Sequence, residues 1–283
     1  MKIKFIRRTS IFFLLSAMLL SCKKDASINE DTTMLDAEST ALISNDDNAA
    51  ENAFYDMKVA ADSAGTEAKS KLKSLIKDSC VAVIVTSYDV ATKTGKVELD
   101  FGTTNCPCND GKLRRGKIEV EYKGDKKLVE SQVIYTPNQY FVNDYGVAGK
   151  KTVTYSAPYT WTIKVENGVV TKPDGKTITW SSDRVRTMVS GTSTPLDPKD
   201  DSFEVTGTSS GKNSAGNDYS FETLSPLLFS YGCDYISSGK LKIKRSGKKD
   251  AIIDYGNGTC DNKGTISVET WTKDITLKGK FAK

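Results

Sequence analysis

Histidine is absent from all 283 residues of the sequence. This absence excludes Ser-His-Asp and Cys-His nucleophile systems, zinc sites ligated by histidine, and an imidazole base that titrates near neutral pH. Any chemistry would have to rely on carboxylates, lysine, tyrosine or cysteine.

An excess of basic charge is also lacking once the first residues are set aside. The whole chain has 40 basic and 36 acidic residues and a net charge of +4. Four of the basic residues, Lys2, Lys4, Arg7 and Arg8, lie in a segment that we expect to be removed, which leaves 36 (40 less 4) basic residues against 36 acidic ones. A nucleic-acid partner normally requires a basic domain, so we do not expect one here.

No hydrophobic run is long enough for a transmembrane helix, which needs about 20 apolar residues. The apolar run at residues 11–20 follows a basic start, which predicts a signal peptide over residues 1–21. It ends in LLSC, which resembles the lipobox of bacterial lipoproteins, so Cys22 is expected to carry a diacylglycerol and an N-acyl chain such as palmitate. Acyl chains of this kind anchor a protein firmly to a membrane. The alternative is an ordinary secretory signal with a chance cysteine.

The charged KKD after Cys22 resembles the export signal of surface lipoproteins in the Bacteroidetes group. It favours an outer-membrane lipoprotein that faces the cell surface, with a periplasmic orientation as the alternative.

Aromatic residues are scarce between residues 23 and 78, where acidic residues are frequent. This composition predicts a disordered tether over residues 22–44. Residues 45–78 are expected to be a helical linker, in which Asn45, Asp46 and Asp47 cap a helix and Gly65 is a possible stop. Residues Phe54, Met57, Val59 and Ala60 or Ala61 would face one side.

From residue 79 onward the hydrophobic period is two. For example, Tyr159, Trp161, Ile163 and Val165 alternate with polar residues, and turn signals such as Asn257-Gly258 recur between such runs. The pattern predicts an all-β class for residues 79–283, an antiparallel multi-stranded sandwich or barrel-like meander preceded by one N-terminal helix and a flexible tether. Trp161 and Trp180 fall on the apolar side of their strands and are expected in the core.

Two stretches of the chain echo each other. Residues 100–106 read DFGTTNC and residues 254–260 read DYGNGTC, while GKIEV at residues 116–120 corresponds to GTISV at residues 264–268. The echo predicts related hairpin units at about residues 79–123 and 232–269.

Five cysteines remain after Cys22. Turn signals lie midway between Cys80 and Cys106 and midway between Cys233 and Cys260, so each pair would close the open end of a hairpin. We therefore predict disulfides from Cys233 to Cys260 and from Cys80 to Cys106 or Cys108, in keeping with an oxidising compartment. The spacing does not favour zinc, and no metal or cofactor is expected.

The first copy of the echo has six more residues than the second after its cysteine, because nine residues separate Cys106 from Gly116 and three separate Cys260 from Gly264. Binding groups are often carried on such loops. The candidate binding residues in this insertion are Cys108, Asn109, Asp110, Arg114 and Arg115. The alternative is a longer turn with solvated charges.

Residues 100–111, 115–118, 173–180 and 254–263 resemble a family of uncharacterised Bacteroidetes lipoproteins with a DFGTTNCxCNDG motif, an RGKI motif and a DYGNGTCDNK echo. The resemblance implies an envelope location and a β-rich fold, and it brings no catalytic residue. The sequence thus predicts a lipid-anchored, non-enzymatic binding or structural module for a glycan, a peptide or an envelope partner. The runner-up is a hydrolase that uses carboxylates such as Asp100, Asp110 or Asp254.

Overall fold

The computed structural model describes residues 30–71, 80–125, 128–194 and 197–277. The chain divides into two units, residues 1–37 and residues 38–283. The described part of the first unit, residues 30–37, is helical; the arrangement below is that of the second unit. The predicted signal peptide and Cys22 lie outside the described residues. Within those residues, no helix combines the length and the apolarity needed to cross a membrane.

The helix α1 begins at Glu30 and ends at Lys71. Its buried positions recur at intervals of three and four residues, which puts them on one broad stripe of the helix surface. They are Thr40, Ile43, Asp46, Asp47, Ala50, Ala53, Phe54, Asp56, Met57, Ala60, Ala61 and Ala64. Five of the twelve are alanine, so α1 can lie close to the surface that it covers.

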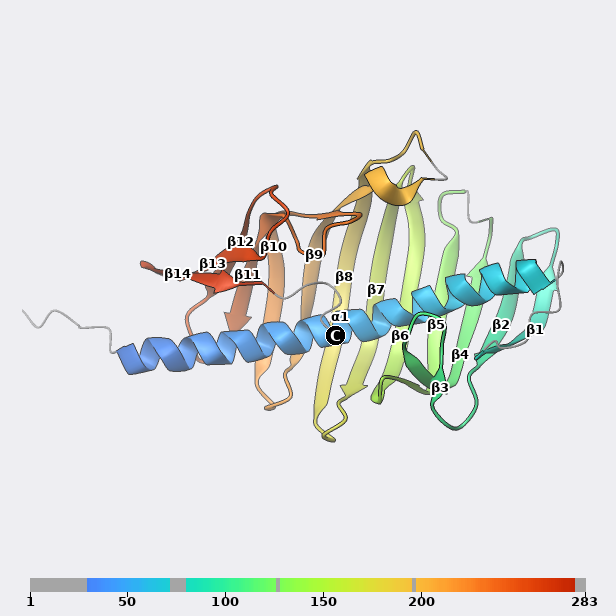
Figure 1. Cartoon of the computed structure of the whole chain (residues 1–283), viewed down its shortest axis with the longest axis horizontal. Coiled ribbons are helices and arrows are strands. Elements are labelled where there is room, and N and C mark those ends of the chain that lie inside the picture. Colours follow the sequence, from blue (N-terminus) through green and yellow to red (C-terminus); the bar gives the residue numbers. More distant parts are fainter. Residues whose placement is uncertain (1–29, 72–79, 126–127, 195–196, 278–283) are drawn as a thin grey trace, which may run out of the picture. The chain divides into compact units, whose positions relative to one another are not determined.

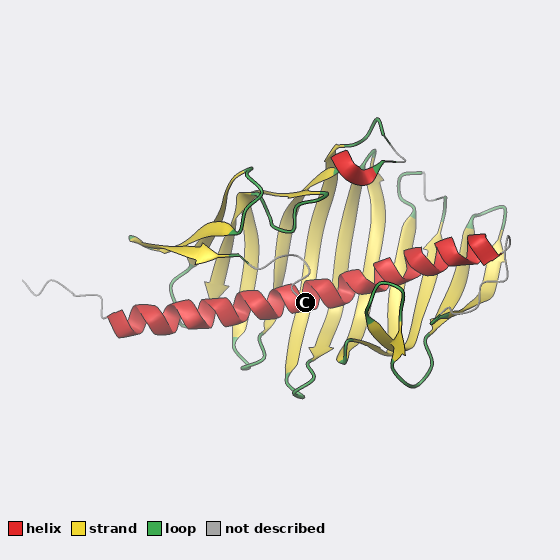
Figure 2. Ribbon diagram, viewed as in Figure 1, coloured by secondary structure: helices red, strands yellow, loops and turns green. Residues whose placement is uncertain are grey.

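The strands form one antiparallel sheet (Figures 1 and 2). Their order is β1-β2-β4 and then β5 to β14 in sequence, with β3 beside β4, so nearly every strand pairs with the next one along the chain. The strands are β1 (Ala82–Asp89), β2 (Thr94–Asp100), β3 (Cys106–Pro107), β4 (Leu113–Lys123), β5 (Gln132–Val142), β6 (Tyr145–Ala157), β7 (Thr160–Thr171), β8 (Thr177–Ser190), β9 (Ser202–Lys212), β10 (Asp218–Ser230), β11 (Ser238–Arg245), β12 (Ala251–Asn257), β13 (Lys263–Val268) and β14 (Trp271–Thr276); a short 3-10 helix, η1 (Pro198–Asp200), precedes β9.

The helix α1 runs across the strands (Figure 1). Thr40 contacts Arg245 of β11, whereas Asp56 contacts Tyr140 of β5 and Arg114 of β4. From Thr40 to Asp56 the helix rises about 24 Å, because each residue adds about 1.5 Å. Six strand spacings of about 4.8 Å, from β11 to β5, give about 29 Å, which agrees with a helix axis that crosses the strands.

The two faces of the sheet differ in character, as β8 illustrates. Its residues alternate between burial on the face that carries α1 and exposure on the other face, which we call the open face. Buried are Ile178, Trp180, Ser182 and Arg184, and exposed are Thr177, Thr179, Ser181, Asp183 and Val185. Cross-strand ion pairs cover the open face, among them Lys150–Glu166, Lys164–Asp183 and Lys242–Glu222.

Two glycines allow the sheet to bend and to accept α1. A Cβ on Gly168 would lie 2.5 Å from the carbonyl oxygen of Trp180 and 3.0 Å from the Phe54 ring, so only glycine fits beneath Phe54. Gly149 has a φ of +114°, which L-amino acids with side chains rarely adopt. Both lie at register shifts of β7 against its neighbours, where β-bulges bend a strand.

The structure corrects the predicted boundary between tether and helix. Residues 30–44 of the expected tether are helical, and α1 continues past Gly65 to Lys71. Asp46 and Asp47 do not cap a helix; they lie within α1 and are only 1% and 8% exposed. Asp47 bonds instead to residues of β8, β9 and β10, and Asp46 to Lys172 and the Ser214 N–H in the turns that follow β7 and β9.

The predicted fold class is confirmed as antiparallel β structure with one N-terminal helix. Of the expected architectures, the meander is the one observed, since the described strands belong to a single sheet. The related hairpin units are also present: Leu99 pairs with Ile118 in the first copy, and Ile253 pairs with Ile266 in the second. In each copy the aspartate accepts a hydrogen bond from the glycine N–H two residues later, Asp100 from Gly102 at 2.8 Å and Asp254 from Gly256 at 3.0 Å.

Both predicted disulfides are confirmed. Cys80 is bonded to Cys106 and Cys233 to Cys260, with Cα separations of 5.7 and 5.8 Å. Cys108 keeps a free thiol, which resolves the alternative for the first pair.

Candidate functional site

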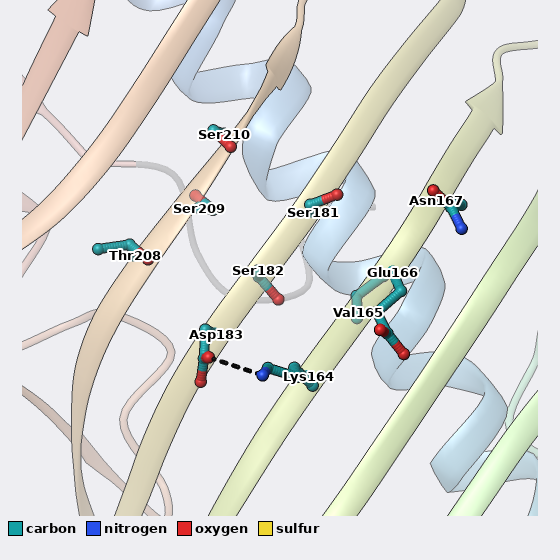
Figure 3. A pocket seen from close by; sticks show the side chains of 10 residues that line it. All are labelled: Lys164, Val165, Glu166, Asn167, Ser181, Ser182, Asp183, Thr208, Ser209 and Ser210. Atoms are coloured by element: carbon teal, nitrogen blue, oxygen red, sulfur yellow. Dashed lines mark ion pairs between the residues drawn. The ribbon is translucent and has the colours of Figure 1, made fainter.

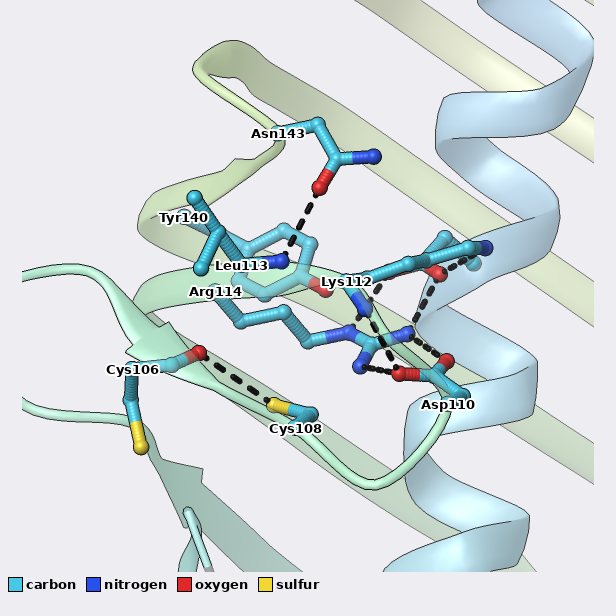
Figure 4. Close-up of polar contacts among 9 residues, drawn as sticks. Cys106, Cys108, Asp110, Lys112, Leu113, Arg114, Tyr140 and Asn143 are labelled. Carbon is cyan, nitrogen blue, oxygen red and sulfur yellow. Dashed lines mark hydrogen bonds and ion pairs between the residues drawn. The ribbon is translucent and has the colours of Figure 1, made fainter. Parts of the chain in front are cut away.

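The inserted loop between β3 and β4 meets α1 in a buried cluster of charges (Figure 4). Arg114 donates from Nε to Asp56 at 3.0 Å and from Nη2 to the same carboxylate at 2.7 Å. Lys112 Nζ and the Tyr140 hydroxyl donate to Asp56 at 2.7 and 2.6 Å. Arg114 also bonds Asp110 at 2.8 and 2.6 Å. The longer loop of the first copy therefore holds the helix. We call the five residues of this cluster the Asp56 clamp: Asp56, Asp110, Lys112, Arg114 and Tyr140.

The electrostatics of the Asp56 clamp favour the fully charged state. Burial alone would raise the pKa of Asp56, but hydrogen bonds and charge from Arg114 and Lys112 hold the pKa of this carboxyl below its usual value. Hydrogen bonds from Arg114 likewise lower the pKa of Asp110. Burial alone would lower the pKa of Arg114, but its hydrogen bonds to Asp110 and Asp56 raise that pKa above its usual value.

A second cluster surrounds Asp47. The Trp180 indole Nε1 donates to its carboxylate at 2.7 Å, Ser209 at 2.8 Å and the Tyr219 hydroxyl at 3.3 Å, while Arg184 lies 3.7 Å away. Burial raises the pKa of Asp47 despite these partners. Residues on β8, β9 and β10 thus fix one turn of α1.

A buried lysine completes the contacts beneath α1. Lys151 of β6 is 2% exposed, and its Nζ donates to the backbone carbonyl of Phe54 at 3.1 Å. Burial lowers its pKa to about 8. Lys151 of β6 thus binds the backbone of α1 directly, and this hydrogen bond helps to hold the helix on the sheet.

The candidate binding residues of the loop are occupied by internal contacts. Asp110 and Arg114 belong to the Asp56 clamp, and the Cys108 thiol lies 3.6 Å from the Cys106 carbonyl with a pKa raised by burial. Arg115 bonds Asn105 and Asp144 and lies 3.8 Å from the centre of the Phe141 ring. Asn109 lies in the turn of this loop. That the loop binds a ligand stays a prediction.

The carboxylates considered for a hydrolase do not lie in a shared site. Asp110 bonds Arg114, Asp100 bonds Lys117 at 3.1 Å, and Asp254 bonds Lys240 at 3.0 Å, and the pKa of each carboxyl lies below its usual value. A glycosidase pair needs one carboxyl group with a raised pKa as the acid. Among the described residues, no three His, Cys, Asp or Glu side chains are grouped so that they could hold a metal ion.

A polar hollow of about 370 Å³ lies on the open face across β7, β8 and β9 (Figure 3). Its side chains include Lys164, Glu166, Ser181, Asp183 and Thr208, and Lys164 pairs with Asp183 at 3.4 Å. Ligand pockets are usually concave and mostly apolar. This hollow is instead an open, polar part of a charged sheet surface.

An aromatic row lies on the α1 side of the sheet, beyond the strip that the helix buries. On β8, burial changes from complete at Arg184 to partial at Arg186 and Met188. Cross-strand pairs extend this partly buried row over β6 to β10, and we call it the aromatic shelf: Tyr155, Trp161, Arg186, Met188, Phe203 and Phe229.

The side chains of the aromatic shelf support each other. The Tyr155 and Trp161 rings are 6.0 Å apart, and the Arg186 guanidinium lies 3.7 Å from the centre of the Phe203 ring. Trp180 lies in the core as predicted, 2% exposed, but Trp161 is only half-buried. The alternation of apolar and polar residues correctly placed Trp161 on the face that carries α1. It did not reveal that α1 covers only part of this face and leaves Trp161 half-buried.

Comparison with family models, with curated proteins and with solved structures gave no match.

Proposed function

We propose that the chain is a lipid-anchored, non-enzymatic binding module of the outer membrane, and that its aromatic shelf binds an extended segment of a partner protein. The observation that carries this proposal is the row of half-buried aromatic side chains beside α1.

The composition of the aromatic shelf favours a protein partner. Aromatic residues, methionine and arginine are enriched at the centres of protein interfaces, whereas lysine, aspartate, glutamate and serine are depleted. All six shelf residues belong to the enriched group. The adjoining segment at residues 197–204 has four acidic residues and one lysine. We therefore expect a partner segment with apolar residues at its centre and basic residues at its margin.

The buried charges support binding rather than catalysis. Asp47, Asp56 and Lys151 each contact a partner across the interface between α1 and the sheet, and these contacts hold the two layers in one arrangement. A rigid surface loses little entropy when it binds, which favours affinity.

The anchor is tested separately from the shelf. We expect Cys22→Ser to abolish incorporation of labelled palmitate and to release the protein from the membrane fraction. For the wild-type protein, protease treatment of intact cells should remove the domain. Full protection in intact cells with digestion after lysis would place it in the periplasm and refute the surface orientation.

The shelf is tested by selecting a displayed peptide library on the wild-type protein. We expect enriched peptides to combine aromatic and basic residues and to bind Trp161→Ala at least about tenfold more weakly, since a well-packed interface aromatic contributes about 2 kcal/mol or more. The matched control is Trp271→Ala, because Trp271 is also half-buried but lies on β14 outside the shelf. Far-UV circular dichroism checks that both variants fold.

Two outcomes would contradict the proposed partner. Equal loss in both tryptophan variants would mean that the effect is structural. Binding to a glycan array that Trp161→Ala abolishes, with no selected peptide, would assign the shelf to a glycan instead of a protein.

A further inference from the structure

The two edges of the sheet are protected unequally. The edge strand β14 contains Lys273 and Asp274, both exposed. The opposite edge strand, β1, has the sequence AVIVTSYD, and every one of its residues is exposed. It contains no lysine, arginine or proline, which are the residues that usually discourage an edge from pairing with another strand. Its protection is a register shift between Val85 and Ser87, where the Thr86 hydroxyl donates to the Lys96 carbonyl at 3.0 Å, so the partner strand has to accommodate this irregularity.

Large apolar side chains project from both faces of β1. Val83 and Val85 pair with Leu99 and Val97 on the α1 side, and they are 38% and 65% exposed. Ile84 projects from the open face and is 45% exposed. An incoming strand must therefore offer apolar side chains on both of its faces.

The edge is also held in place before any partner arrives. The disulfide from Cys80 to Cys106 ties the start of β1 to the segment before β4. At the other end, the Asp89 carboxylate accepts from the Ala91 N–H at 2.8 Å and closes the turn to β2. A preordered edge reduces the entropy lost on pairing.

We propose that β1 pairs antiparallel with β1 of a second copy of this chain, about a two-fold axis perpendicular to the sheet. The segment itself has the required pattern, with valines on one face and Ile84 on the other. Asp89, the one charged residue of β1, lies at its end. Two antiparallel copies thus keep their aspartates apart.

The alternative pairing of β1 with β14 of another copy is less favourable. It would place Lys273 and Asp274 against valine and isoleucine. It would also leave a free β14 edge on one copy and a free β1 edge on the other; these edges can pair again with further copies and produce open-ended filaments, whereas the two-fold pairing uses both β1 edges and closes. In the two-fold dimer, the helix-bearing faces of both sheets lie on the same side.

The test uses the purified full chain in nonionic detergent, with its mass measured by light scattering across a concentration series. We expect the wild-type protein to be a dimer. Val85→Lys should weaken association at least tenfold, because two lysines would meet near the centre of the paired strands. The matched control is Thr272→Lys on the β14 edge, which should leave the mass unchanged.

Charge complementation makes the test specific. Val85→Glu alone should weaken association to a similar extent, and a mixture of the Val85→Lys and Val85→Glu proteins should restore the dimer. In the wild-type protein, deuterium exchange of the amides at residues 82–89 should slow as concentration rises. A wild-type protein that stays monomeric at about 100 µM, or a dimer that Val85→Lys leaves intact and Thr272→Lys disrupts, would overturn the proposal.

Discussion

The Asp56 clamp predicts a large stability loss when its acidic member is removed. Asp56 and Arg114 have side chains that are 1% and 3% exposed, so Asp56→Ala leaves a buried guanidinium with only Asp110 as an acidic partner. Breaking a buried ion pair by removing one partner costs about 3 to 5 kcal/mol. Because Asp110 remains, we expect about 3 kcal/mol, which lowers the melting temperature by about 6 to 12 °C.

The assay is urea unfolding at pH 7, followed by tryptophan fluorescence and analysed by linear extrapolation. The matched control is Asp62→Ala, which removes the acidic member of the exposed Lys58–Asp62 pair on the same helix. An exposed pair contributes about 0 to 1 kcal/mol. A double variant with Arg114→Ala should lose less than the sum of the two single variants, because the two residues share one interaction.

The pH dependence supplies a second check on the same residue. The pKa of Asp56 is lower in the folded protein than in the unfolded chain. Its contribution to stability is therefore complete above the ordinary aspartate pKa of about 3.9 and is lost as pH falls below it. The difference between wild type and Asp56→Ala should shrink in acid. A loss below about 1 kcal/mol at pH 7, as for an exposed pair, would refute the buried clamp.

Three further predictions concern other parts of the fold. Lys151, whose pKa falls to about 8 on burial, makes the protein gain stability between pH 8 and about 10.5, by at most about 3 kcal/mol, and Lys151→Met should abolish that rise in pH-dependent urea unfolding. Replacing both Cys233 and Cys260 by serine should cost about 3 to 4 kcal/mol, because the bond closes a loop between residues 27 apart; equal stability of the variant and the oxidised wild type would contradict this. Gly168→Ala should destabilise by about 1 to 3 kcal/mol through overpacking against Phe54, measured by calorimetry, whereas Gly175→Asn should retain most of the stability, because that position has open space and asparagine tolerates its φ of +81°.

The sequence predicted the strands well and the helix incompletely. Alternation is a local signal, and the echo between residues 100–106 and 254–260 identified two hairpins together with their disulfides. The helix start was misplaced because Asp46 and Asp47 resemble caps in sequence. Their burial depends on Trp180 and Lys172, more than 120 residues away, which no local pattern reports.

The inserted loop was located correctly as the point where the two copies differ, but its contacts could not be foreseen. Arg114 bonds Asp56 from 58 residues away, and Asp56 lies in a segment whose acidic composition suggested disorder. The positions of Asp46, Asp47 and Asp56 within the three-and-four spacing of buried residues are the local sign that these acidic residues face the interior. To predict the aromatic shelf, one would have to know how much of the sheet α1 covers, in addition to the alternation along the strands.

The meander also determines the order in which the molecule can assemble. Most strands pair with a neighbour close in sequence, so the sheet can grow hairpin by hairpin with little loop-closure cost. The contacts of α1 are different: Thr40 bonds Arg245, 205 residues later. Of the described elements, α1 is synthesised first and is thus the last to find its full complement of partners, and until β11 has formed, the apolar stripe of α1 needs protection from other chains.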